Sequence, residues 1–226
     1  MKKIFTLLAL TISFSMNAQV STNNTSNSGT SSTAMGLSTT ASGNYSTAMG
    51  GGTTASGASS TAMGDSTTAS GNYSTAMGGV TTASGTNSTA MGDNTTASGG
   101  ASTAMGRETT ASGDYCTAMG RSTTASGFTS TAMGLSTTAS DYSSTVIGQY
   151  NSSGSSATSA DSFSTSAPAF VIGNGTASNA KSDAFKVMFN GDATVSNDLT
   201  VSGDVVISSD ARLKSNIVSL GSTLPK

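Results

Sequence analysis

A fourteen-residue unit, STAMGxxTTASGxx, repeats along most of this chain and limits its fold more than any other feature. A fixed period of this length is typical of a solenoid, in which each unit packs only against its neighbours. Such an array presents a long surface and need not contain a pocket. The TAMG copies begin at Thr33, Thr47, Thr61, Thr75, Thr89, Thr103, Thr117 and Thr131, and a degenerate TVIG copy begins at Thr145.

Each unit has room for two short strands, which predicts an all-β fold built of parallel coils. Two strands of about five residues fit, each followed by a turn of two or three residues. Glycines such as Gly36 and Gly43 are expected to end the strands, because glycine adopts the backbone angles of tight corners. The residue pairs that vary between copies follow these glycines, as in Asn44-Tyr45, and are expected to lie in exposed turns.

Side-chain parity predicts which residues face the interior of the coils. Ala34 and Gly36 share one face of the first strand, and Ala41 and Gly43 share the corresponding face of the second. Because two strands enclose only a thin interior, small residues are expected inside it. The larger Met35 then points outward, as do its equivalents in the other copies.

The outward methionines form an apolar column with one member in each of eight copies. A ridge of this length exceeds the apolar surface that a soluble monomer normally exposes. The thin core also buries too little apolar area to offset the conformational entropy of the chain. Both considerations predict oligomerisation through this column, whose members are Met35, Met49, Met63, Met77, Met91, Met105, Met119 and Met133.

The composition excludes several classes of function. The 226 residues include no histidine and one cysteine, and the net charge is −2. Without histidine, a Ser-His-Asp or Cys-His site cannot form, and the commonest zinc ligand is missing. There is no basic stripe to bind nucleic acid. We therefore expect no metal, no cofactor and no enzymatic activity, and we interpret Cys116 as a serine position that has drifted.

The N-terminus has the pattern of a secretory signal peptide, residues 1–18. Lys2 and Lys3 precede an apolar stretch over residues 4–14, and small residues follow, with cleavage expected after Ala18. The stretch is too short for a transmembrane anchor, and no later segment is apolar enough to be one. The sequence thus predicts a secreted or cell-surface protein.

The remaining chain divides by composition and pattern. Period-2 alternation at Phe185 and Val187, and again at Leu199, Val201, Val205 and Ile207, predicts strands, with a turn at Asn190-Gly191. The expected segments are a flexible leader (19–31), the repeat array (32–148), a polar transition (149–184), a β-rich neck (185–208) and a final segment (209–226).

The repeat resembles the head repeats of trimeric autotransporter adhesins of the YadA type. The residues that carry the resemblance are Ser-x-Ala-x-Gly, a short spacer and a second Ala-x-Gly, over residues 32–148. It implies a left-handed parallel β-roll in which three chains associate side by side. It also implies binding to a surface, protein or glycan ligand that the sequence does not identify. The coiled-coil stalk and membrane anchor of that family are not found after residue 148.

The segment Ser209-Asp210-Ala211-Arg212-Leu213-Lys214-Ser215-Asn216-Ile217 is similar to the start of the endosialidase-type intramolecular chaperone of phage tail spikes. The resemblance implies self-cleavage between Ser208 and Ser209, with Ser209 as nucleophile and Lys214 as its base. Eighteen residues run from Ser209 to Lys226, whereas this chaperone is much longer. We therefore expect a truncated start of that domain, inactive in this chain.

Three functions follow from these patterns. The leading one is a secreted trimeric fibre protein with an adhesin-like head. A second is a precursor that cleaves itself after Ser208. A third is an ice-binding solenoid with ranked threonines, which is disfavoured because the adjacent Thr39 and Thr40 must point to opposite faces, so that only Thr40 and Ser42 align.

Overall fold

The computed structural model describes residues 24–202 and contains two kinds of strand that alternate along the repeats. One series has five residues per strand: β2 (Thr33–Leu37), β4 (Thr47–Gly51), β6 (Thr61–Asp65), β8 (Thr75–Gly79), β10 (Thr89–Asp93), β12 (Thr103–Arg107), β14 (Thr117–Arg121), β16 (Thr131–Leu135) and β18 (Thr145–Gln149). The other has two: β1 (Ser26–Asn27), β3 (Thr40–Ala41), β5 (Thr54–Ala55), β7 (Thr68–Ala69), β9 (Thr82–Ala83), β11 (Thr96–Ala97), β13 (Thr110–Ala111), β15 (Thr124–Ala125) and β17 (Thr138–Ala139).

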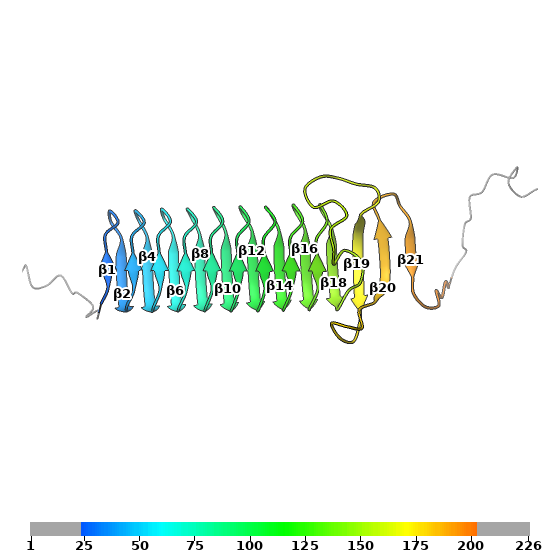
Figure 1. Ribbon diagram of the computed structural model, residues 1–226, viewed down its shortest axis with the longest axis horizontal. Coiled ribbons are helices and arrows are strands. Elements are labelled where there is room, and N and C mark those ends of the chain that lie inside the picture. The colour runs from blue at the N-terminus through cyan, green and yellow to red at the C-terminus, as the bar shows by residue number, and fades with distance from the viewer. Residues whose placement is uncertain (1–23, 203–226) are drawn as a thin grey trace, which may run out of the picture. The chain divides into compact units, whose positions relative to one another are not determined.

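These strands form a parallel β-solenoid of nine coils (Figure 1). The short strands make a nine-stranded sheet, the short-strand sheet, in the order β1-β3-β5-β7-β9-β11-β13-β15-β17. The long strands make the long-strand sheet, which β19 (Pro168–Asn174), β20 (Asp183–Met188) and β21 (Ala193–Val195) extend beyond β18 to twelve strands. Equivalent residues of successive coils pair in register, as Met91 does with Met105. The described residues include no helix, so the predicted all-β solenoid is confirmed.

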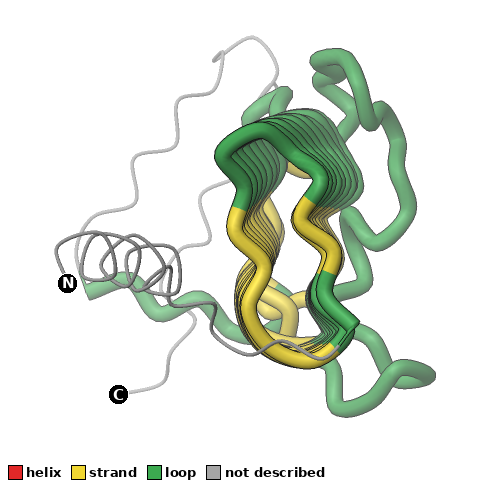
Figure 2. Tube along the Cα trace, turned by 90° about the vertical axis from the view of Figure 1, so that its left-hand side faces the viewer, coloured by secondary structure: helices red, strands yellow, loops and turns green. Residues whose placement is uncertain are grey.

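The interior of the coil is as thin as the sequence predicts, and Figure 2 shows the two strand series facing each other across it. Ala41 and Ala48 are fully buried, as are their equivalents in the following coils. Thr39 and Ser46 also point inward and are at most 1% exposed. The core is therefore a set of stacked alanine, threonine and serine columns rather than a cluster of large apolar side chains.

The glycine after each methionine does not lie inside, contrary to the prediction for Gly36. Gly50, its equivalent in the next coil, is exposed at a corner within β4 that follows the buried Ala48, so this glycine bends the strand rather than ending it. The corner demands glycine for two reasons. The backbone angle φ of Gly50 is +122°, and a Cβ atom there would collide with the carbonyl group of Gly64 on the next coil.

The second residue of each variable pair adopts a left-handed conformation, although only Gly52 among these corners is a glycine. Tyr45 has a φ of 59° and Val80 a φ of 52°. Each of these corners is held by its neighbour, since the Tyr45 amide donates to Thr30 and the Val80 amide donates to Asp65, at 2.8 and 2.9 Å. The ladder of hydrogen bonds between coils thus imposes a conformation that these side chains disfavour.

Val80 and Thr129 are the two β-branched residues at these corners, and β-branched side chains rarely adopt positive φ. The Val80 side chain is 55% exposed, so little packing is lost when it is removed. We expect Val80→Gly to stabilise the protein by about 1 kcal/mol in urea unfolding. Gly52→Val, at the equivalent corner two coils earlier, should destabilise it by a similar amount. Equal stability of Val80→Gly and the parent would contradict this strain.

Several segment boundaries differ from the prediction. Ser26–Asn27, assigned to the leader, forms β1 and pairs with β3, so the array begins earlier. Pro168–Asn174, assigned to the polar transition, forms β19 and continues the sheet beside β18. The Asn190-Gly191 turn is confirmed between β20 and β21. The first compact unit of the chain ends at Ser196. The strand predicted at Leu199 and Val201 is not found, because both residues lie after that boundary, are exposed and form no strand.

Asn151 closes the short-strand sheet by imitating a further strand. Its side-chain Oδ1 accepts from the Thr138 amide at 2.8 Å, and its Nδ2 donates to the Thr138 carbonyl at 2.9 Å. Asp141 stands where earlier copies carry glycine, and its buried Oδ1 accepts from the amides of Thr158 and Ser159. These two side chains end the array and anchor residues 150–167, the end loop, against its last coil.

We expect Asn151→Ala to destabilise the protein by about 2 kcal/mol, because it leaves both backbone groups of Thr138 without these partners. The side chain is 1% exposed, so water cannot easily replace it. The midpoint of thermal unfolding measures the effect. Asn174→Ala is the matched control, since the side-chain oxygen of Asn174 accepts a hydrogen bond from the exposed side chain of Ser182 rather than capping a backbone group. Equal effects of the two substitutions would argue against the capping role.

Candidate binding surface

The methionine column lies on the outer face of the long-strand sheet. Met91 pairs in register with Met77 on one side and Met105 on the other, and the alanine beside it is fully buried. All eight predicted methionines are half-buried and share this face. Ile147 occupies the equivalent place in the last coil, next to Ile172 of β19. The structure thus brings the predicted interface residues together as one continuous apolar strip.

Three tyrosines project from the corners that follow the short strands. Tyr45, Tyr73 and Tyr115 are 66%, 63% and 62% exposed. The residue before each tyrosine holds the corner by a side-chain hydrogen bond to the preceding coil. The side-chain oxygen of Asn44 accepts from the Thr30 amide at 3.0 Å, and that of Asp114 accepts from the Gly100 amide at 2.6 Å. The variable pair therefore combines a residue that ties the corner to the preceding coil with one that is displayed.

Tyr115 also begins a row of aromatic rings on successive coils. Its ring meets that of Phe128 edge to face at 5.4 Å, and Phe128 stacks on Tyr142 at 5.5 Å. The end loop binds the backbone of the same corners, because the Phe128 amide donates to Ala160 and the Tyr142 amide donates to Ser159. Phe128 thus contacts the ring of Tyr115 on one neighbouring coil and that of Tyr142 on the other.

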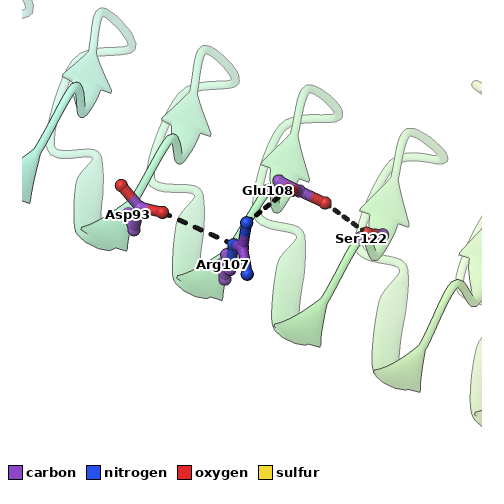
Figure 3. A network of polar contacts seen from close by, with 4 residues as sticks. All are labelled: Asp93, Arg107, Glu108 and Ser122. Carbon is purple, nitrogen blue, oxygen red and sulfur yellow. Dashed lines mark hydrogen bonds and ion pairs between the residues drawn. The ribbon is translucent and has the colours of Figure 1, made fainter.

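The corners after the long strands carry most of the charge of the array. Arg107 lies 3.5 Å from Asp93 on the preceding coil and 3.4 Å from Glu108, whose carboxylate accepts from Ser122 (Figure 3). The side chains of Arg107 and Asp93 are 58% and 63% exposed. Ion pairs this exposed contribute roughly 0–1 kcal/mol each. This polar network lies on the surface of the solenoid and contains no arrangement suited to catalysis.

Cys116 is buried in a serine column and has no sign of a reactive thiol. It is 1% exposed, and its Sγ donates to the Ala125 carbonyl at 3.2 Å. Burial raises the pKa of the thiol to about 11, so the nucleophilic thiolate is scarce at neutral pH. The geometry supports the interpretation of this residue as a drifted serine.

The other sites predicted from the sequence lie partly outside the residues that the structure describes. Ser208, Ser209 and Lys214 lie outside the described residues, as do the signal peptide, Val205 and Ile207. Over residues 24–202 no three acidic, cysteine or histidine side chains gather as a metal site would require. Nor does this same span hold a helix with the length and apolarity needed to cross a bilayer.

The adjacent threonines weighed for an ice-binding surface point to opposite faces, as the parity predicts: Thr39 is buried, whereas Thr40 is partly exposed.

Comparison with protein families gives a direct match to the array. The family model described as the YadA head domain repeat, two copies long, matches residues 28–53, 55–80, 83–109, 97–123 and 125–151. Together these segments make up just over half of the 226 residues. A search of curated proteins gave no match.

Proposed function

Since this chain belongs to the family of YadA head domain repeats, we propose that it is a secreted or surface-exposed, adhesin-like fibre head that acts as a homotrimer. The observation that carries the trimer is the methionine column. It is a continuous apolar strip on the outer face of a coil whose interior is built mostly of alanine, serine, threonine and glycine. Three such strips that meet around one axis would supply the apolar core that a single chain lacks.

Adhesion would use the tyrosine corners, because they lie outside the methionine column, after the short strands, and carry the largest exposed hydrophobic side chains of the array. Tyrosine offers a large, rigid contact area and a hydroxyl group at a low cost in conformational entropy. A repeat that displays it at several coils can bind an extended ligand through many weak contacts at once. The partner class is therefore a repetitive protein or glycan surface.

The test measures how many beads coated with the full chain are retained on surfaces coated with fibrous extracellular protein or with mucin. We expect Tyr45→Ser, Tyr73→Ser and Tyr115→Ser together to reduce bead retention by roughly tenfold or more. The control replaces Leu37 and Val80, which are 59% and 55% exposed at the opposite corners, by serine. Equal retention of the triple variant and the parent would contradict the proposal.

The alternative proposal is a precursor that cleaves itself between Ser208 and Ser209, on the resemblance of residues 209–217. Mass spectrometry of the full open reading frame expressed in cells tests it directly. A product that ends at Ser208, and that disappears in Ser209→Ala, would support it. An intact chain would remove it.

A further inference from the structure

We infer that the methionine column is a modification site for two-electron oxidants, and that its oxidation blocks assembly of the fibre head. The inference rests on the proposed trimer and adds that oxidation of the methionines regulates whether the trimer forms. Its basis is the way the fold concentrates one oxidisable side chain on one face. The array has no histidine or tryptophan, and its one cysteine is buried, so the thioethers are its main soft nucleophiles.

The column is continuous because every methionine pairs in register with the next. The seven pairs are Met35 with Met49, Met49 with Met63, Met63 with Met77, Met77 with Met91, Met91 with Met105, Met105 with Met119, and Met119 with Met133. Neighbouring side chains are therefore about 4.8 Å apart along the sheet. Each is half-buried in the single chain, which leaves part of it open to small solutes.

The reaction is the transfer of one oxygen atom. A sulfur lone pair attacks hydrogen peroxide, the O–O bond breaks, the sulfur becomes a sulfoxide and the peroxide leaves as water. The product is polar and chiral where the thioether was apolar. Eight such groups turn the strip into a polar surface that would have to be desolvated for chains to meet.

The fold of the single chain should survive this change, because the methionines face outward. The interior columns at Thr39, Ala41, Ser46 and Ala48 contain no sulfur apart from Cys116. Assembly would conversely cover the column and slow its oxidation. The order of events therefore matters: oxidation before assembly prevents it, whereas assembly first protects the thioethers.

The experiment compares the two orders on the full chain. One sample is unfolded, treated with hydrogen peroxide and refolded; the other is treated after refolding. Sedimentation velocity measures the trimer fraction, and peptide mass spectrometry counts oxygen atoms at each methionine. Met188 in β20 is half-buried outside the column and serves as the internal reference. We expect the first order to lower the trimer fraction about tenfold or more, with recovery after methionine sulfoxide reductase.

A variant with isoleucine at all eight column positions is the matched control, since Ile147 already occupies this place in the last coil. It should form trimers whatever the treatment. Equal assembly of sulfoxide-bearing and untreated parent chains would overturn the inference while leaving the trimer intact. A loss of assembly in the isoleucine variant would also overturn it, because the damage would then lie elsewhere. An untreated parent chain that is monomeric would instead refute the proposed trimer itself.

Discussion

Gly78→Ala is expected to destabilise the array by at least about 3 kcal/mol, although it adds only one methyl group. The backbone of Gly78 has a φ of +121°, and the new Cβ would collide with the carbonyl oxygen of Gly92 while lying 2.9 Å from its carbonyl carbon. Both atoms belong to the backbone of the next coil, which cannot move without breaking the ladder. Urea unfolding followed by circular dichroism measures the loss.

Gly79→Ala is the control, at the neighbouring residue. Its φ is not in the left-handed region, and the nearest atom to a Cβ there is the side-chain Oδ1 of Asp93 at 3.4 Å. This substitution should change the free energy of unfolding by less than about 1 kcal/mol. If the two alanine variants are equally stable, the close approach of backbones between coils does not limit this position.

The second large effect is expected when charge is placed on the methionine column. Met63→Asp, Met91→Asp and Met119→Asp put one carboxylate on every second coil, so that the new charges are not direct neighbours. In the proposed trimer these groups would be buried without partners, at a cost of several kcal/mol in total. We therefore expect trimer formation to weaken by more than about 100-fold in sedimentation velocity.

Thr68→Asp, Thr96→Asp and Thr124→Asp carry the same three charges on the outer face of the short-strand sheet. These threonines are partly exposed on β7, β11 and β15, away from the methionines. The threonine variant should remain trimeric and should show whether strand propensity alone affects folding. Trimers that persist in the methionine variant would place the interface on another face.

The sequence predicts the architecture well because the repeat encodes it many times. A period of fourteen residues, small residues at one parity and methionine at the other led to the coil, its alanine core and its methionine face. The resemblance to YadA head repeats is likewise confirmed by the family match within residues 28–151. The resemblance of residues 209–217 to a chaperone stays a prediction.

What the sequence could not predict depends on contacts between coils. The corner at Tyr45 reads as an ordinary turn, yet hydrogen bonds to the preceding coil hold it at positive φ. The prediction that Gly36 faces the interior was wrong, because it extended the alternation of the strand past the residue at which the chain turns. Asn151 and Asp141 carry no motif, and their capping roles arise only where the array ends. An aspartate in a glycine column was the one available signal.

The regularity of the ladder has a consequence for how chains would align. Because each coil pairs with the next in the same register, two arrays displaced by one whole unit would present nearly the same methionine strip to each other. The repeats alone therefore do not determine how the chains are aligned along the solenoid axis. Asn151, Asp141 and the end loop occur once per chain, so they are among the features within residues 24–202 that can make the unshifted alignment unique.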